Sequence, residues 1–136
     1  MVIQNDNLVT TQFDPGVPCV HQVWQGFASS EKFREATRNV IKFVQEKNRQ
    51  YPKIQFLVDA RKLGALSKED VEWAAKEADP VLYKAGMRKI AFIMPEKVIA
   101  ELTLKNYQRI AENTVVNQME SQLFSDEAVA RKWLKS

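Results

Sequence analysis

The sequence predicts an α/β fold in one domain over residues 1–136, with a mixed β-sheet and helices packed against it. Two nearly continuous apolar runs, at 54–60 and 89–94, have the pattern of central strands that are covered on both faces. Amphipathic segments at 31–47 and 96–113 alternate with these runs, as helices do in crossovers between parallel strands. A chain of 136 residues can close around one hydrophobic core.

The N-terminal part of the chain predicts a β-hairpin. Residues 7–13 and 17–25 resemble two strands, with Asp14-Pro15-Gly16 between them. Proline presets φ for the first turn position, and we expect the glycine to supply a positive φ at the next. Alternation along the second strand puts its side chains on two faces: Val20, Gln22 and Trp24 on one, and Cys19, His21 and Val23 on the other.

The first helix is expected at 31–47, because one stripe of its surface is apolar. Ser29 or Ser30 can cap it, and Glu31 lies in its first turn. Pro52 prevents continuation of the helix. The residues of the apolar stripe are Phe33, Ala36, Val40, Phe43 and Val44.

The middle of the chain predicts a buried strand at 54–60, a loop at 61–66 and a second helix that Ser67 caps. Asp70 completes an imperfect capping box at the start of that helix. Small residues in its apolar stripe allow close packing on the sheet, and Pro80 is expected to kink the helix or to start a separate turn. The stripe consists of Val71, Ala74, Ala75 and Ala78.

The last third predicts a strand at 89–94, a helix at 96–113, a strand within 115–124 and a final helix capped by Ser125. The element order is therefore β-β-α-β-α-β-α-β-α. We assign the core face of the longer helix to Val98, Ile99, Leu102, Ile110 and Tyr107. The final helix is expected to be anchored by Ala128, Val129 and Trp133 or Leu134.

Composition argues against several classes of protein. Twenty basic residues against 17 acidic ones give a net charge of +3, a surplus too small to predict a nucleic-acid partner. The single cysteine, Cys19, excludes an intramolecular disulfide. No apolar run approaches the roughly 20 residues of a membrane-spanning helix, and the N-terminus lacks a signal-peptide pattern. We therefore expect a cytoplasmic protein without an integral membrane segment.

No catalytic constellation is visible in the sequence. His21 is the only histidine, no second cysteine is available for zinc, and the four glycines are scattered. A triad of Ser67, His21 and Asp59 is possible by composition, but their spacing gives it no support. We therefore expect a protein that is not an enzyme and that has no cofactor and no bound metal.

Four residues are candidates for a switch or for contact with a partner. Asp59 ends a buried strand, where open α/β sheets bind ligands, although an Asp there can also bond its own loop, which contains Arg61. Ser67 is either a helix cap or a phosphorylation site next to free backbone N–H groups. Trp73 lies about a quarter-turn from the apolar stripe of its helix, so it covers the core edge or contacts a ligand or partner.

Several segments resemble the SpoIIAA-like family, and together they span nearly the whole chain. These segments are Phe56-Leu57-Val58-Asp59, Leu66 to Trp73, Gly86 to Phe92 and Leu123 to Leu134. The family is grouped with STAS domains (sulfate transporter and anti-sigma-factor antagonist) and with the CRAL-TRIO lipid-carrier fold. The resemblance implies a mixed sheet, no catalysis and a regulatory binding role. STAS domains are often switched by phosphorylation of a serine at the start of the helix after the Asp-ended strand, here Ser67. Where antagonists have an Asp-Ser-Ser-Gly type motif, this sequence has Leu66-Ser67-Lys68-Glu69-Asp70.

Two functions follow from these observations, and a third ranks last. The favoured hypothesis is a non-enzymatic regulatory module that binds a protein partner through the region from Asp59 to Trp73. The alternative is a small carrier or sensor of an apolar, lipid-like ligand, with Val98, Leu102 and Tyr107 lining its pocket. A hydrolase or transferase that uses Asp59, Ser67 or His21 is the remaining hypothesis.

Overall fold

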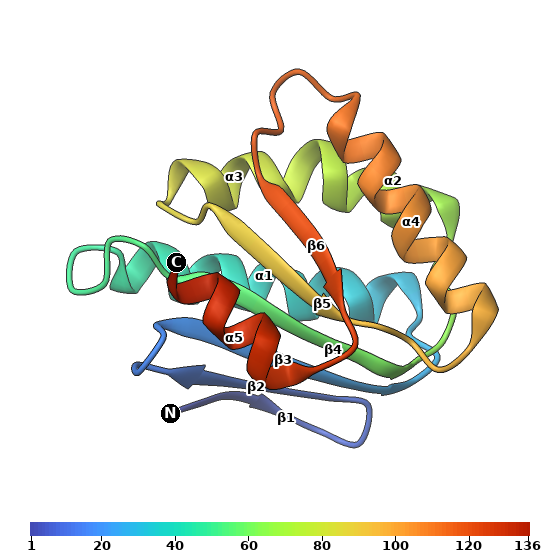
Figure 1. Ribbon diagram of the computed structural model, residues 1–136, viewed down its shortest axis with the longest axis horizontal. Helices are drawn as coiled ribbons and strands as arrows, with labels where there is room; N and C mark the ends of the chain where they lie inside the picture. Colours follow the sequence, from blue (N-terminus) through green and yellow to red (C-terminus); the bar gives the residue numbers. More distant parts are fainter.

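The computed structural model describes residues 1–136 and contains one six-stranded mixed sheet (Figure 1). The first three strands pair antiparallel, and the others continue the sheet in parallel from the third. The order of the strands in the sheet is the same as their order along the chain. The strands are β1 (Val2–Asn5), β2 (Val9–Asp14), β3 (Cys19–Gly26), β4 (Gln55–Leu63), β5 (Lys89–Ile93) and β6 (Glu120–Phe124).

Helices cover both faces of the sheet unequally (Figure 1). One face carries α1 (Ser30–Lys47), α2 (Lys68–Trp73), the π-helical turn η1 (Ala74–Ala78), α3 (Asp79–Lys84) and α4 (Val98–Glu112). The other face carries α5 (Glu127–Lys135). This arrangement confirms the predicted α/β fold with a mixed sheet and helices packed against it.

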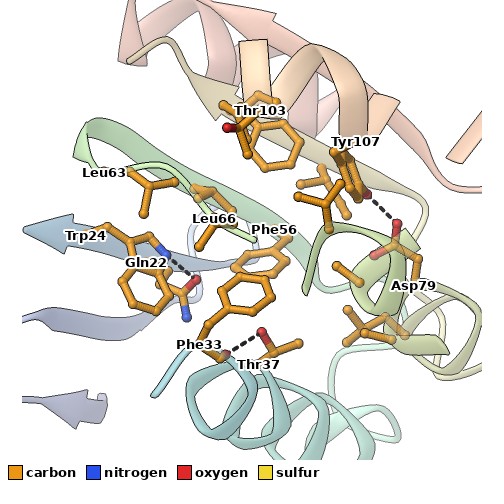
Figure 2. A pocket seen from close by; sticks show the side chains of 18 residues that line it. Gln22, Trp24, Phe33, Thr37, Phe56, Leu63, Leu66, Asp79, Thr103 and Tyr107 are labelled. Carbon is orange, nitrogen blue, oxygen red and sulfur yellow. Dashed lines mark hydrogen bonds between the residues drawn. The ribbon is translucent and has the colours of Figure 1, made fainter. Parts of the chain in front are cut away.

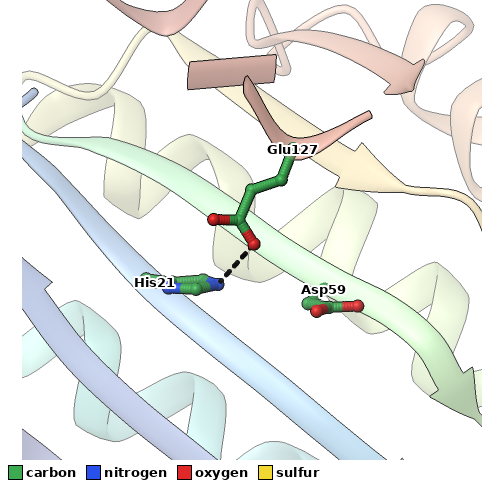
Figure 3. Close-up of side chains that lie close together, drawn as sticks. All are labelled: His21, Asp59 and Glu127. Atoms are coloured by element: carbon green, nitrogen blue, oxygen red, sulfur yellow. Dashed lines mark ion pairs between the residues drawn. The ribbon is translucent and has the colours of Figure 1, made fainter. Parts of the chain in front are cut away.

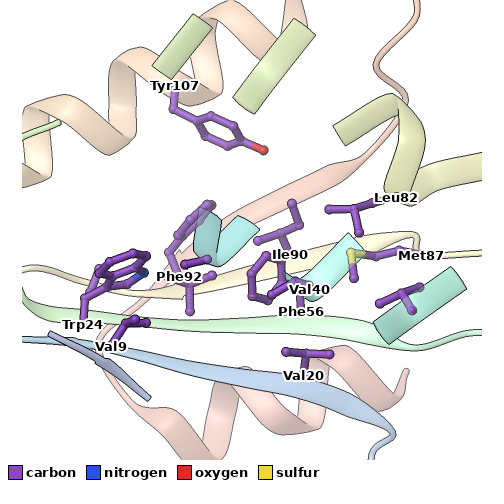
Figure 4. Close-up of a cluster of buried hydrophobic side chains, with 14 of the residues drawn as sticks. Val9, Val20, Trp24, Val40, Phe56, Leu82, Met87, Ile90, Phe92 and Tyr107 are labelled. Atoms are coloured by element: carbon purple, nitrogen blue, oxygen red, sulfur yellow. The ribbon is translucent and has the colours of Figure 1, made fainter. Parts of the chain in front are cut away.

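Two hydrophobic clusters follow from this layering. The larger cluster joins side chains of β2 to β5 with those of α1 to α4 (Figure 4), including Val20, Trp24, Val40, Leu82 and Tyr107. The smaller cluster lies under α5 and includes Cys19, Leu57, Ile93, Ala130 and Leu134. The two faces of β3 are therefore used as its alternation predicts, with Val20 and Trp24 in one cluster and Cys19 in the other.

Helix caps explain where two helices begin. The Ser29 hydroxyl accepts a hydrogen bond from the Lys32 amide at 3.2 Å. The Ser67 hydroxyl accepts one from the Asp70 amide at 3.1 Å. Both serines therefore satisfy an N–H group that has no partner inside the helix, and the prediction that Ser67 caps a helix is confirmed.

The strands differ from the prediction in three places. The short edge strand β1 was not expected, since four residues at a sheet edge leave little alternation to detect. The expected positive φ at Gly16 is wrong, and four residues, 15–18, connect β2 to β3 where three, 14–16, were predicted. The predicted loop at 61–66 begins later, because β4 continues to Leu63 alongside the end of β3.

Helix α4 packs through a different face from the one predicted. Its buried residues are Ala100, Leu104, Tyr107 and Ala111, and the two alanines allow the helix to approach closely. Leu102 lies two residues, or about 200°, from Ala100 and Leu104, so it points to solvent. The assignment of Val98, Ile99 and Leu102 to the core is wrong: their exposed fractions are 70%, 69% and 59%.

The C-terminal helix begins one residue later than predicted. The carboxylate of Asp126, not the hydroxyl of Ser125, accepts hydrogen bonds from the amides of Ala128 and Val129 at 2.7 and 3.4 Å. The helix consequently buries Ala130 and Leu134, while Val129 is 53% exposed. Anchoring through Ala128 and Val129 is therefore wrong, and anchoring through Leu134 is confirmed.

Pro80 lies just after the π-helical turn. The amide of Asp79 donates to the carbonyl of Ala74, five residues earlier, and Pro80 follows within the first turn of α3. The wider turn accommodates a residue that has no backbone N–H to donate. None of the helices combines the length and the apolar character needed to cross a bilayer.

Candidate functional site

An apolar cavity lies between the sheet and the helices of its more heavily covered face (Figure 2). Its volume is about 70 Å³, and 14 of the 18 residues that line it are hydrophobic. One water occupies roughly 10–15 Å³ on this measure, so the cavity has room for about five water-sized groups. Large apolar side chains form much of the wall, among them Trp24, Phe33, Phe56, Phe92 and Tyr107.

A buried carboxyl group, that of Asp79, lines this cavity. Asp79 is 4% exposed, and its Oδ2 accepts hydrogen bonds from the Tyr107 hydroxyl and, at 2.9 Å, from the Asn117 side-chain amide. Asn117 is fixed in turn by a 2.8 Å bond from the same amide to the Ala75 carbonyl. No protein group donates a hydrogen bond to Oδ1. The carboxyl group therefore keeps one acceptor atom free.

Burial is the main cause of the raised pKa values of Asp79 and Tyr107. It raises the pKa of Asp79 from 3.8 to about 6, although the hydrogen bonds from Tyr107 and Asn117 oppose the shift. Burial and the neighbouring carboxylate raise the pKa of Tyr107 well above its usual value of 10.0. No basic side chain contributes to the shift at Asp79. At neutral pH the cavity is thus bordered by a carboxylate without a cation.

The other polar groups at the cavity wall have partners within the protein. The indole N–H of Trp24 donates to Gln22 at 2.9 Å, and the Gln22 amide is 3.4 Å from the hydroxyl of Thr11. The Thr37 and Thr103 hydroxyls donate to carbonyls of their own helices at 2.9 and 3.0 Å. These groups therefore have less to offer a ligand than Asp79 does.

The structure places the three predicted ligand-lining residues differently. Tyr107 lines the cavity and packs edge-on against Phe92, with ring centroids 5.4 Å apart. Val98 and Leu102 lie outside the cavity, on the solvent side of α4. Their predicted lining role is corrected for the reason given above: α4 packs through its alanine face.

A second cluster lies on the opposite face of the sheet, beside the N-terminus of α5 (Figure 3). One ligating atom from each of His21, Asp59 and Glu127 falls within 4.8 Å of the others. His21 Nε2 is 3.9 Å from Glu127 Oε1 and has no hydrogen-bond partner, although the nitrogen is buried. A histidine and two carboxylates form a donor set that a divalent cation can use.

Two arginines already occupy this donor set. Arg61 binds Asp59 through two nitrogens, at 3.1 and 2.7 Å, and Arg131 contacts Glu127 at 3.2 Å. Arg131 also donates to His21 Nδ1 at 3.1 Å, so the neutral ring carries its proton on Nε2. Neither ring nitrogen of His21 therefore has a free lone pair for a metal, because Nδ1 accepts from Arg131 and Nε2 carries the proton. The geometry favours an ion-pair network over a metal site.

The pKa values in this network follow from burial and from the arginines. Burial, followed by the charge of Arg131, lowers the pKa of His21. Burial raises the pKa of Asp59, but hydrogen bonds from Arg61 outweigh it, and the pKa lies below the usual value of 3.8. Asp59 also accepts a 3.1 Å bond from the Arg61 backbone amide. The bond from Asp59 to its own loop backbone, which the sequence suggested, is therefore present, and the ion pair with the Arg61 side chain adds to it.

The four residues predicted as one partner-binding region are divided between the two faces. Asp59 and Arg61 belong to the network under α5, where Arg61 is 52% exposed. Ser67 caps α2. Trp73 is half-buried against α1. Its ring meets Phe33 edge to face, with ring centroids 6.2 Å apart, and lies under the guanidinium groups of Arg34 and Arg38, 5.0 and 5.5 Å away. The structure does not join them into one surface.

Sequence reasoning missed the residues that complete both clusters. Asp79 lies four residues after Ala75 on the buried side of its helix, a signal that Pro80 obscured by suggesting a turn. Asn117 gave no signal, because it lies in a loop and reaches Asp79 across 38 positions. Glu127 and Arg131 have i, i+4 spacing on the C-terminal helix, but nothing in the sequence places them beside His21.

Comparisons with known proteins agree with this architecture. The model of the SpoIIAA-like family matches residues 20–135. A crystal structure of an uncharacterised protein from Shewanella loihica PV-4, of the DUF3478 family and with a SpoIIAA-like fold, superposes with a TM-score of 0.58 at 16% identity. That comparison covers 96% of this chain and 98% of the other. Among curated proteins, none matches the sequence. The family match covers most of the chain, and the expected resemblance is confirmed: this protein is a member of the SpoIIAA-like family.

Proposed function

We propose that this protein is a non-enzymatic carrier or sensor that holds a small apolar molecule in the cavity between its sheet and α4. The observation that carries the proposal is the cavity itself, which has a volume of about 70 Å³ and is lined by 18 residues, 14 of them hydrophobic. Ligand pockets in proteins are concave and mostly apolar, with a few polar groups that fix orientation. Here Asp79 and Tyr107 are those polar groups.

The proposal includes no catalytic step, and the contacts of the titratable residues support that choice. His21 Nδ1 accepts a bond from Arg131, and the two neighbouring carboxylates each bind an arginine. The Ser67 hydroxyl caps a helix instead of facing His21. A general base needs a free lone pair within reach of a substrate proton. In this network only Glu127 Oε1 accepts no hydrogen bond, and it lies on the face of the sheet opposite the cavity.

Pentane tests the proposal, because it lacks polar groups and its five carbons match the room for about five water-sized groups in the cavity. In a titration followed by amide NMR shifts, we expect changes confined to residues around the cavity. Ala74→Leu puts a larger side chain into the cavity and so occupies part of the space that the ligand needs. We expect it to weaken binding about tenfold or more, which corresponds to about 1.4 kcal/mol of binding free energy. Ala128→Leu, at an exposed position on α5, is the matched control and should bind like the original protein. Shifts that are absent, or equal in both variants, contradict the proposal.

A second candidate function is a regulatory module that binds a protein partner. The observation that favours it is the solvent-exposed side of α4, where Val98, Ile99 and Leu102 present three large apolar side chains close together. Isolated exposed apolar residues are ordinary, but adjacent ones on one helix face are typical of interaction surfaces. This surface lies on the same helix as Leu104 and Tyr107, which line the cavity.

The partner hypothesis is tested by exchanging the exposed apolar side chains. Proteins that co-purify from the native cell should be lost from a Val98→Ser, Leu102→Ser double variant. They should be retained by Val129→Ser, which removes a comparably exposed apolar side chain on α5. Because none of these side chains is buried, all the variants should fold. Identical co-purifying proteins in both variants would exclude α4 as the contact surface.

A further inference from the structure

We infer that the cavity selects apolar molecules that carry one cationic or hydroxyl hydrogen-bond donor, and that Asp79 Oδ1 receives that donor. This inference rests on the proposed function and names the chemical class of its ligand. It depends on the position of one carboxyl group and on the identity of the groups around it.

The first observation is the uneven use of the two carboxylate oxygens of Asp79. Tyr107, whose bond is drawn in Figure 2, and Asn117 both donate to Oδ2, whereas no protein group donates to Oδ1. Asp79 is 96% buried and is part of the cavity wall. Oδ1 is not one of the fully buried atoms that lack a partner, so a small molecule can reach it, and a ligand that supplies a donor gains a hydrogen bond to a carboxylate oxygen. The free acceptor therefore points to the complementary group on the ligand.

The second observation is the absence of a cation beside this carboxylate. The side chains bonded to it, a phenol from α4 and an amide from the loop before β6, are neutral, and Asp79 takes part in no ion pair. A ligand ammonium group would supply the missing positive charge, and a hydroxyl would supply a donor alone. A carboxylate ligand, such as a fatty acid, would instead place a second negative charge in the same apolar surroundings, which is unfavourable.

The third observation concerns size. Room for about five water-sized groups fits a molecule with four or five carbon atoms and one polar end, without movement of the wall. Tyr107 helps to set the orientation of such a molecule, because its hydroxyl is already bonded to Asp79 and its ring packs against Phe92. The apolar part of the ligand is then left to contact the aromatic wall.

A matched series of butylamine, butan-1-ol, butyrate and pentane tests the selectivity at pH 8, with dissociation constants taken from amide NMR titrations. We expect butylamine to bind about tenfold or more tightly than butyrate, with butan-1-ol between them, because a hydrogen bond between opposite charges is stronger than one between a charged and a neutral group. Asp79→Asn should remove the preference for butylamine and leave pentane binding within about twofold.

Tyr107→Phe is the second variant, since it removes a donor to Oδ2 but keeps the carboxylate. It should retain at least the original preference for butylamine, and this result separates the charge of Asp79 from general damage to the cavity. Pentane binding with no preference among the polar probes overturns the inference and leaves the proposed function standing. An unchanged preference in Asp79→Asn also overturns it. If none of the four probes binds, the proposed function falls together with the inference.

Discussion

Arg34 on α1 and Asp70 on α2 form an ion pair between two helices, with Arg34 Nε 3.0 Å from Asp70 Oδ1. Asp70 also accepts a 2.7 Å hydrogen bond from the Ser30 hydroxyl and is 1% exposed. Its carboxylate therefore joins the start of α1 to the start of α2.

Replacing Asp70 by Ala should destabilise the protein by about 3 kcal/mol, because the partly buried Arg34 and the Ser30 hydroxyl lose their partner. Glu69→Ala, at the exposed neighbouring position, should change the free energy of unfolding by less than about 0.5 kcal/mol. Urea denaturation of both variants measures the difference. Equal effects would mean that the ion pair contributes little.

Acid should weaken the same contact. Burial raises the pKa of Asp70, but hydrogen bonds from Ser30 and Arg34 outweigh it, so the pKa in the folded protein is below 3.8. The stabilisation is thus present above pH 3.8 and is lost as the pH falls through the folded-state pKa. In Asp70→Ala, this part of the acid dependence of stability should be missing.

Asp79 should give the opposite pH dependence. Its pKa rises from 3.8 to about 6 on folding, so its contribution to stability is fully present below pH 3.8 and is lost as the pH rises through about 6. The change amounts to about 3 kcal/mol. Unfolding free energies measured from pH 4 to pH 8 should therefore fall more steeply in the original protein than in Asp79→Asn. Parallel curves would show that the carboxyl group is not buried as described.

Removing the charge of Arg131 should raise the pKa of His21. Burial lowers this pKa most, and Arg131 is the next cause. In Arg131→Gln the positive charge is gone while the ring stays buried, so proton binding becomes easier. An NMR titration of the single histidine reads the pKa directly. Lys132→Gln, at the adjacent exposed position, is the control and should leave the titration unchanged.

The helix caps provide a fifth comparison. Ser67→Ala and Asp126→Ala should each cost about 1 kcal/mol, because each removes the side-chain acceptor for amides at a helix N-terminus. Ser125→Ala should cost much less, since the Ser125 hydroxyl caps no amide. Thermal or urea unfolding of the three variants ranks them. A larger loss at Ser125 than at Asp126 would contradict the observed cap.

The buried strands were predictable, whereas the packing face of α4 was not. Strands β4 and β5 are covered on both faces, so most of their residues are apolar and do not alternate with polar ones. This pattern can be recognised in the sequence alone. In α4 the exposed residues Val98, Ile99 and Leu102 have the spacing of a core face. The true face contains two alanines, and the hydrophobicity of alanine is too small to reveal it in the sequence.

The candidate site was predictable only in part, because it depends on contacts between distant segments. Tyr107 was expected at an apolar pocket and is there. Its partner Asp79 lies 28 positions away, next to a proline that is typical of turns. Local pattern identifies a residue that is buried, but it does not identify the residue that will be buried beside it.

The agreement between strand order and chain order has a consequence for synthesis of the protein on the ribosome. Each new strand pairs with the one made just before it, and no strand has to be inserted between two others. The sheet can therefore grow from its N-terminal edge as the chain emerges, with each incomplete form ending in an open strand edge that the next segment covers. Of the two open edges of the growing sheet, one is always the short strand β1 and the other is the strand made last.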